Sequence, residues 1–272
     1  GACKEDADGK KVADETKRAE AWKKYERYWT QICDRFKDYS DHLIFEGANE
    51  ELGDRLNDAI YESGYCVPKD DNDTKAISGN LTEDERYEMA NKINQKFVDI
   101  VRSTGGNNAY RHLLIAGYDT NIDKTCDDKF KMPTDTAENG ITKLSISVHY
   151  YTPWDFCGDG GSGIYTQKDK EATETYFTKM DKFYNAGYGI IMGEFSVCNP
   201  KQEGVAQWLN DTMTIAAKHH ILPVLWETNQ YMDKDNCKMR YNDIAVLYNT
   251  ITGSTGDTSS KINTNGTTTD GS

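Results

Sequence analysis

Apolar residues near the start of the chain recur at helical spacing. Between about residues 14 and 38 they lie three or four positions apart, as on one face of a helix. The face consists of Trp22, Tyr25, Trp29, Ile32 and Phe36. A second pattern of this kind follows Thr82 and Glu85, which have the spacing of a capping box, and stops at Gly105-Gly106. The chain therefore opens with two long amphipathic helices.

Short, continuous apolar runs fill the space between helical patterns in the rest of the chain. The runs predict strands at 42–46, 113–116, 144–151, 189–195 and 221–226. Helices are predicted over about 170–186, 203–219 and 240–251, and a loop rich in Asp, Asn and Gly over roughly 51–81. Apolar strands alternating with helices indicate a parallel sheet that is covered on both faces.

Composition narrows the class of partner. The chain has 272 residues and a formal net charge of −13. It lacks a basic stripe that could neutralise phosphates, which argues against nucleic acid. It also lacks the roughly 18 consecutive apolar residues that a membrane helix needs. A neutral polysaccharide is compatible with this surface.

Seven cysteines are present and none has CxxC spacing, which disfavours a structural zinc site. Cys33 lies within the first helical pattern, so we expect a buried thiol there. The others fall in predicted loops, where an oxidising compartment would allow disulfides whose pairing stays open.

Polar and aromatic residues gather at the ends of the predicted strands. In a parallel α/β protein the functional side chains project from the carboxyl ends of the strands. The residues at these ends are Asn49, Glu50, His149, Tyr151, Glu194 and Trp226. Two carboxylates beside a histidine, a tyrosine and a tryptophan suit glycoside hydrolysis, in which one carboxyl protonates the leaving oxygen and the other acts at the anomeric carbon.

Four of these strand ends, in order, resemble motifs of glycoside hydrolase family 5. Leu43–Glu50 is similar to the end of the family's fourth strand, Ser147–Tyr151 to the His-x-Tyr of the sixth, and Ile191–Phe195 to the Gly-Glu-Phe of the seventh. Leu225–Thr228 resembles the tryptophan motif of the eighth strand. The stretch Phe97–Asn108 is similar to one found in the cellulase and xyloglucanase subgroup.

The resemblance implies a (β/α)8 TIM-barrel fold and a retaining endo-β-1,4-glucanase. Glu194 would be the nucleophile, and Glu50 the acid that then activates water. Asn49, His149 and Tyr151 would support them, and the carboxyl groups of the pair should lie about 5–5.5 Å apart. The chemistry needs no cofactor and no metal. One departure is Glu51, where many members of the family have proline.

Further residues lie near these ends. Trp226 is a candidate for sugar stacking, and Trp154, Asn229 and Tyr231 are candidate substrate-binding residues on the same loops. His219-His220 ends a predicted helix, and we expect helix-terminal polarity there rather than metal binding.

Only five of the eight barrel strands are recognisable, corresponding to the family's fourth to eighth. Residues 1–252 would form an incomplete barrel, and 253–272 a Gly/Ser/Thr-rich linker or tail. Unpaired sheet edges are a liability, so we expect an associated N-terminal fragment or a swapped partner to complete the barrel. The family resemblance also implies a secreted, extracellular protein that acts on β-glucan.

Two other interpretations stay open. The chain could be a non-catalytic carbohydrate-binding remnant of the same fold, although two retained carboxylates argue against it. The same chemistry could act on xyloglucan, mixed-linkage glucan, mannan or xylan, because loops decide specificity. A metal-dependent deacetylase is disfavoured because the sequence offers no ligand cluster.

Overall fold

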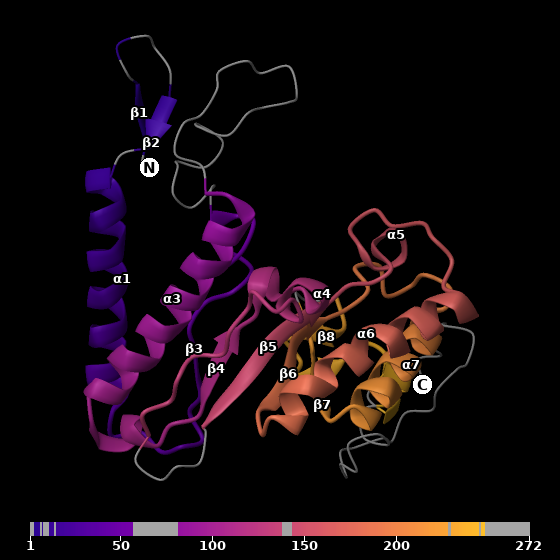
Figure 1. Cartoon of the computed structure of the whole chain (residues 1–272). Coiled ribbons are helices and arrows are strands. Elements are labelled where there is room, and N and C mark those ends of the chain that lie inside the picture. Colours follow the sequence, from indigo (N-terminus) through magenta and orange to yellow (C-terminus); the bar gives the residue numbers. More distant parts are fainter. Residues whose placement is uncertain are drawn as a thin grey trace. The chain divides into compact units, whose positions relative to one another are not determined.

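The computed structural model describes residues 3–5, 7, 11–13, 15–56, 81–137, 143–227, 230–244 and 246–247 (Figure 1). The chain divides into two compact units, residues 1–147 and 148–272. Asn229, the tail at 253–272 and most of the loop expected at 51–81 lie outside the described residues. None of the described helices is long and apolar enough to cross a membrane.

The first unit contains two long helices and three parallel strands. Strand β4 pairs in parallel with both β3 and the start of β5, and β1 forms an antiparallel pair with β2. The elements are β1 (Cys3–Glu5), β2 (Lys11–Ala13), α1 (Glu15–Phe36), β3 (Phe45–Glu46), α3 (Glu83–Ser103), η1 (Gly106–Ala109), β4 (Leu113–Ala116), η2 (Tyr118–Thr120), α4 (Ile122–Thr125) and β5 (Leu144–Tyr150). From Val148 onward, β5 belongs to the second unit.

The second unit repeats the strand–helix alternation. Strands β6 and β7 pair in parallel, with an irregularity between Met192 and Phe195, and β8 and β9 form an antiparallel pair. The elements are α5 (Trp154–Cys157), α6 (Gln167–Asn185), β6 (Gly189–Phe195), α7 (Val205–Lys218), β7 (Ile221–Leu225), β8 (Met232–Asp233) and β9 (Lys238–Met239). Residues 242–244 and 246–247 are helical, within the last helix expected from the sequence.

The predicted helices and parallel strands are therefore confirmed, with small differences at their ends. The runs at 113–116 and 189–195 match β4 and β6, and the capping box of Thr82 and Glu85 opens α3. The first strand is shorter than expected, because only Phe45 and Glu46 pair with β4. The hairpins β1–β2 and β8–β9 were not predicted.

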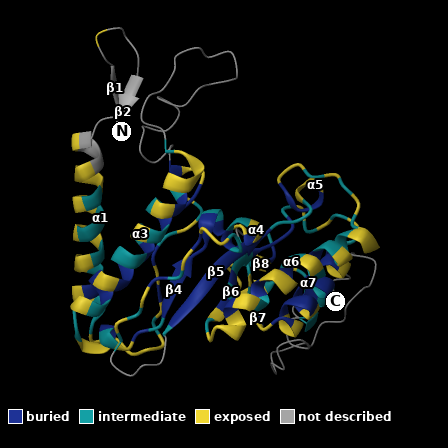
Figure 2. Cartoon of the chain, viewed as in Figure 1, coloured by how far each residue is buried: buried dark blue, intermediate teal, exposed yellow. Residues whose placement is uncertain are grey.

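Aromatic packing joins α1 to α3 and to β3. The ring of Trp29 lies 4.6 Å from that of Phe97 and 5.9 Å from that of Phe45, between centroids. A Cβ on Gly47 would come within 2.7 Å of the Phe97 ring, so the chain leaving β3 requires glycine there. Helix α1 is nevertheless exposed along much of its length (Figure 2), and Cys33 is its one buried residue among the side chains described.

The thiol of Cys33 confirms one expectation. It is fully buried and forms no disulfide. Burial raises its pKa to about 11, so it is a poor nucleophile at neutral pH.

A buried ion pair fixes the end of α3. Arg102 donates two hydrogen bonds to Asp135, from Nε at 2.8 Å and from Nη2 at 3.0 Å, and both side chains are almost fully buried. Burial by itself would raise the pKa of Asp135, but the hydrogen bonds and charge of Arg102 lower it below the ordinary value. The pair therefore stabilises the first unit only while Asp135 is ionised.

We expect Asp135→Asn to destabilise the first unit by about 3–5 kcal/mol at pH 7, because the Arg102 charge stays buried without a counter-charge. The pKa of Asp135 is lowered in the folded state, so its stabilisation is complete above the unfolded value near pH 4 and is lost as pH falls. Urea unfolding at pH 7 and in acid should show the difference between variant and wild type shrinking in acid. Glu88→Gln, which breaks an exposed pair with Lys92, is the control and should cost about 0.5 kcal/mol or less. An equal effect of the two variants would contradict the prediction.

Candidate active site

Two side chains hold the carboxylate of Glu194 at the end of β6. One is His149 on β5, and the other is Tyr151, just after the end of β5. The Tyr151 hydroxyl donates a hydrogen bond of 2.8 Å to Oε2 of Glu194. Nδ1 of His149 lies 3.5 Å from the same oxygen. The period-two alternation of an extended chain points 149 and 151 the same way, so both reach one carboxylate. Glu194 is thus oriented, yet its side chain is still partly exposed to solvent.

The ring of Tyr151, whose hydroxyl holds this carboxylate, lies against two tryptophan rings. The Tyr151 ring lies 6.4 Å from Trp226 and 6.4 Å from Trp154, edge to face in both cases. The backbone N–H of Trp226 donates to the carbonyl of Phe195, which ties the end of β7 to the residue after Glu194. Trp154, on α5, is 66% exposed. An exposed indole next to the tyrosine that holds the carboxylate offers a flat apolar surface to a sugar ring.

The structure corrects the sequence-based role of Tyr231. Its ring is fully buried, and its hydroxyl donates to the carbonyl of Val197 at 2.8 Å and accepts from the Val197 N–H at 3.3 Å. The side chain satisfies backbone groups beyond β6 and offers no face to a glycan. Asn229, the other candidate on this loop, lies outside the described residues.

Sequence reasoning missed Glu227, which shapes the turn after Trp226. Its Oε2 accepts hydrogen bonds from the backbone N–H groups of Tyr231, at 2.6 Å, and of Met232, at 3.1 Å. The sequence could have indicated this residue, because Glu227 directly follows Trp226 within the fourth motif. Its contacts show a role in holding the loop that carries Trp226.

The second carboxylate, Glu50, belongs to the first unit and follows β3. It is half-buried, and its neighbour Asn49 is exposed. The chain before them is fixed by the Gly47 N–H, which donates to the Leu114 carbonyl at 3.2 Å. The separation of about 5–5.5 Å between the Glu50 and Glu194 carboxyl groups stays a prediction.

Three other polar residues have partners within the fold. Glu46, on β3, accepts a hydrogen bond of 2.7 Å from the Ser147 hydroxyl, so it bonds to β5, the strand beyond β4 in the sheet. His219 contacts Asp181 through Nδ1 and Glu174 through Nε2, both at 2.9 Å. His220 stacks on Tyr184. These contacts agree with a helix-terminal role for the two histidines.

We expect Tyr151→Phe to lower kcat by about 10–100-fold, because the Glu194 carboxylate loses a hydrogen bond that fixes its direction. The ring and its contacts with Trp154 and Trp226 stay, so KM should change by less than about threefold. Steady-state kinetics on carboxymethylcellulose measure both. Tyr188→Phe, on the loop before β6 in the same unit, is a control that should leave kcat unchanged. A rise in KM at constant kcat would instead show that the hydroxyl binds substrate.

Comparison with known proteins agrees with this geometry. The model of the cellulase family, glycosyl hydrolase family 5, matches residues 6–232. The chain belongs to glycoside hydrolase family 5. Its fold is therefore of the (β/α)8 TIM-barrel type, which the parallel strands and intervening helices bear out. The match confirms the family that the order of the strand-end motifs suggested.

Several family 5 relatives are similar over most of this chain. Endoglucanase A of Paenibacillus barcinonensis is 33% identical over 75% of this chain and 52% of its own length. The xyloglucan-specific endo-β-1,4-glucanase of Bacteroides ovatus is 29% identical over 77% of this chain and 41% of its own length. The chain thus spans about half the length of such relatives, or less.

Solved structures give the same result. A family 5 lichenase from a Caldicellulosiruptor species, in a mutant form with cellotetraose, has a TM-score of 0.66 at 28% identity, covering 82% of this chain and 61% of that one. A GH5-4 broad-specificity endoglucanase from an uncultured bovine rumen ciliate has a TM-score of 0.65 at 29% identity, covering 85% and 65%.

Proposed function

We propose that this chain is the greater part of the catalytic domain of a retaining endo-β-1,4-glucanase. The observation that carries the proposal is the Glu194 carboxylate, oriented by His149 and by Tyr151, whose ring lies against the exposed ring of Trp154. A carboxylate held in one direction next to a sugar-sized aromatic platform suits attack on an anomeric carbon. Family 5 membership supports the same chemistry.

The proposed reaction has two steps. Glu194 attacks the anomeric carbon from one face, while Glu50 donates a proton to the departing glycosidic oxygen. Glu50 then removes a proton from a water molecule, which displaces Glu194 and releases the sugar with its original configuration. The hydroxyl of Tyr151 would hold Glu194 in line throughout. These side chains carry every proton and covalent step, so the proposal requires no metal or organic cofactor.

The stereochemistry of the product tests the proposal. Proton NMR of cello-oligosaccharide hydrolysis should show the β-anomer first, followed by slow mutarotation to the α-anomer. If the α-anomer appears first, the reaction inverts configuration, and the assignment of Glu194 as nucleophile is wrong.

The substrate we propose is a β-1,4-glucan. The relatives support this choice, since several of them carry the name endoglucanase. Names of other relatives refer to xyloglucan and to a lichenase, so side-chain-bearing and mixed-linkage glucans are the first alternatives. Initial rates on carboxymethylcellulose, xyloglucan, mixed-linkage glucan, mannan and xylan at equal mass concentration would rank them.

The rival proposal is that the chain is a non-catalytic carbohydrate-binding remnant of the same fold. It predicts that carboxymethylcellulose retards the protein in an affinity gel but is never hydrolysed. Hydrolysis that disappears in the Glu194→Gln variant would exclude it.

We also propose that a further segment completes the barrel. Among the described residues, β7 pairs only with β6, and Leu222 and Val224 on β7 are 56% and 45% exposed. In the part of the first unit that the structure describes, β3 pairs only with β4, and the aromatic face of α1 is half-buried. A segment with three parallel β/α units would cover this apolar surface, the occupant that family membership favours.

Complementation tests this step. We expect the chain alone to have little activity, and to gain it when co-expressed with the first three β/α units of a family 5 relative such as the Paenibacillus barcinonensis enzyme. A fully active, monomeric chain without any added segment would show that the barrel needs no completion.

We further propose that the protein works outside the cell, because a polymeric glucan does not cross a membrane. Cell fractionation with antibodies to this chain tests that location.

A further inference from the structure

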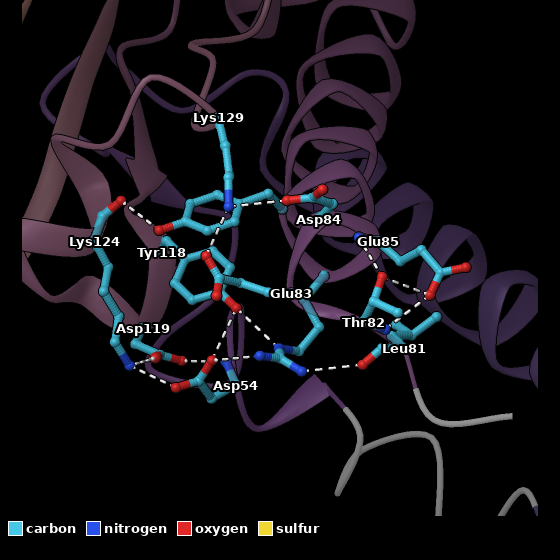
Figure 3. Close-up of polar contacts among 12 residues, drawn as sticks. Asp54, Leu81, Thr82, Glu83, Asp84, Glu85, Tyr118, Asp119, Lys124 and Lys129 are labelled. Carbon is cyan, nitrogen blue, oxygen red and sulfur yellow. Dashed lines mark hydrogen bonds and ion pairs between the residues drawn. The ribbon is translucent and has the colours of Figure 1, made fainter. Parts of the chain in front are cut away.

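A cluster of charged side chains lies beside the loop that follows Glu50 (Figure 3). Lys124 Nζ bridges two carboxylates, with Asp54 Oδ2 at 2.6 Å and Asp119 Oδ2 at 2.7 Å. Arg86 lies 3.3 Å from Asp54 Oδ1, and its Nε donates to the Tyr118 hydroxyl. That hydroxyl donates in turn to Asp54 at 2.9 Å. We call Asp54, Arg86, Tyr118, Asp119 and Lys124 the Asp119 clamp.

Asp119 holds the backbone of the loop directly. Its carboxylate accepts a hydrogen bond of 2.8 Å from the Asp54 N–H, and its own N–H donates to the Leu52 carbonyl at 2.7 Å. A Cβ on Gly53 would lie 1.9 Å from Asp119 Oδ1, so glycine is required for this approach. Asp119 itself adopts a left-handed conformation, with φ of 51°, which its contacts on both sides stabilise.

These contacts fix the chain that follows Glu50. Before Glu50, the Gly47 N–H is bonded to β4. After Glu50, Leu52 is buried and its carbonyl accepts a hydrogen bond from Asp119. Glu50 thus lies in a short segment whose two ends are held by hydrogen bonds, so the direction of its carboxyl depends on both contacts.

Asp54 and Lys124 are each stabilised in their charged form within the clamp. Burial would by itself raise the pKa of Asp54, but hydrogen bonds from Lys124 and Tyr118 lower it. Burial would also lower the pKa of Lys124, but its hydrogen bonds to Asp119 and Asp54 raise it well above the ordinary value. The ion pair between Asp54 and Lys124 is therefore stable over a wider pH range than the ordinary pKa values of the two groups would allow.

We propose that Asp119 is a positioning residue for Glu50, acting through the loop at Leu52, Gly53 and Asp54. The inference rests on the proposed function, in which Glu50 protonates the leaving oxygen. Proton donation requires a hydrogen-bond distance to that oxygen, and a misplacement of about 1 Å can cost on the order of 100-fold in rate. Loss of the clamp should therefore impair the step that needs the acid and spare the step that does not.

Leaving-group dependence separates positioning from simple structural support. The kcat/KM value reports glycosylation, which needs acid help for a sugar leaving group and little for 2,4-dinitrophenolate. We expect Asp119→Ala to lower kcat/KM for cellotetraose about 10–100-fold, and kcat/KM for 2,4-dinitrophenyl β-cellobioside less than about threefold. Asp119→Asn keeps an oxygen for the Asp54 N–H and should recover part of the loss. Equal falls on both substrates would overturn the proposal.

Two controls make the outcome decisive. Glu83→Gln breaks a neighbouring exposed pair with Lys129 that does not touch the loop, and both kcat/KM values should stay unchanged. Glu50→Ala should show the same leaving-group dependence more strongly. If kcat/KM of Glu50→Ala does not depend on the leaving group, the proposed function is wrong. If Glu50→Ala shows this dependence and Asp119→Ala does not, only the positioning role of Asp119 is wrong. Should Asp119→Ala not fold, Asp119→Asn carries the test through the ratio of the two kcat/KM values, and an equal fall on both substrates would overturn the proposal.

Discussion

Replacing Glu194 by glutamine is expected to lower kcat on carboxymethylcellulose by about 10⁴-fold or more, and to leave glucan binding almost unchanged. Glutamine keeps the shape of the side chain and can still accept from the Tyr151 hydroxyl, but it cannot attack the anomeric carbon. An interaction made only on the way to the transition state affects kcat and spares binding. The aromatic rings of Trp154 and Trp226, which would bind the sugar, are untouched.

Two measurements check this result. Steady-state hydrolysis gives kcat, and retardation in a gel containing carboxymethylcellulose gives binding. Glu203→Gln, at an exposed position before α7 in the same unit, is the matched control and should behave as wild type. A fall of only a few-fold for Glu194→Gln would show that another group is the nucleophile. Loss of binding together with loss of turnover would assign Glu194 to substrate binding instead.

Strands were predictable from the sequence wherever burial extended along the whole element. All seven residues of β5 are buried (Figure 2), so its apolar run stands out from the polar loops around it. In β3 the expected strand was too long, because the pairing depends on which backbone groups meet β4, and Ile44 is exposed. The hairpins β1–β2 and β8–β9 escaped prediction because their strands have only two or three residues.

The residues of the site were likewise predictable only in part. The positions of Tyr151 and His149 beside Glu194 follow from strand ends and period-two alternation, which the sequence displays. Tyr231 was placed wrongly because residue type does not reveal which backbone groups need a partner, here those of Val197. The contact between Asp54 and Asp119 joins residues 65 positions apart, so no local sequence pattern predicts it. Sequence reasoning therefore placed Tyr151 and His149 beside Glu194 and missed contacts, such as that between Asp54 and Asp119, that join distant parts of the chain.

The second large effect is expected for Glu50→Ala, for which kcat/KM on cello-oligosaccharides should fall by about 10²–10⁴-fold, the usual contribution of a general acid. Activated aryl cellobiosides should still form the glycosyl-enzyme, which then persists because no base activates water. Azide is small enough to enter the space left by the carboxyl and needs no base to react. Adding azide should therefore restore turnover of 2,4-dinitrophenyl β-cellobioside.

The configuration of the azide product assigns the two carboxylates independently of rate. In Glu50→Ala, azide displaces Glu194 from the face opposite the covalent bond, so the product should be the β-cellobiosyl azide. If Glu50 were instead the nucleophile, its removal would let azide attack the substrate itself, and the α-azide would form. Proton NMR of the purified product distinguishes the two by the anomeric coupling constant. The β-azide from Glu50→Ala, with the α-azide from Glu194→Gly, would fix both roles, and the reverse pair would exchange them.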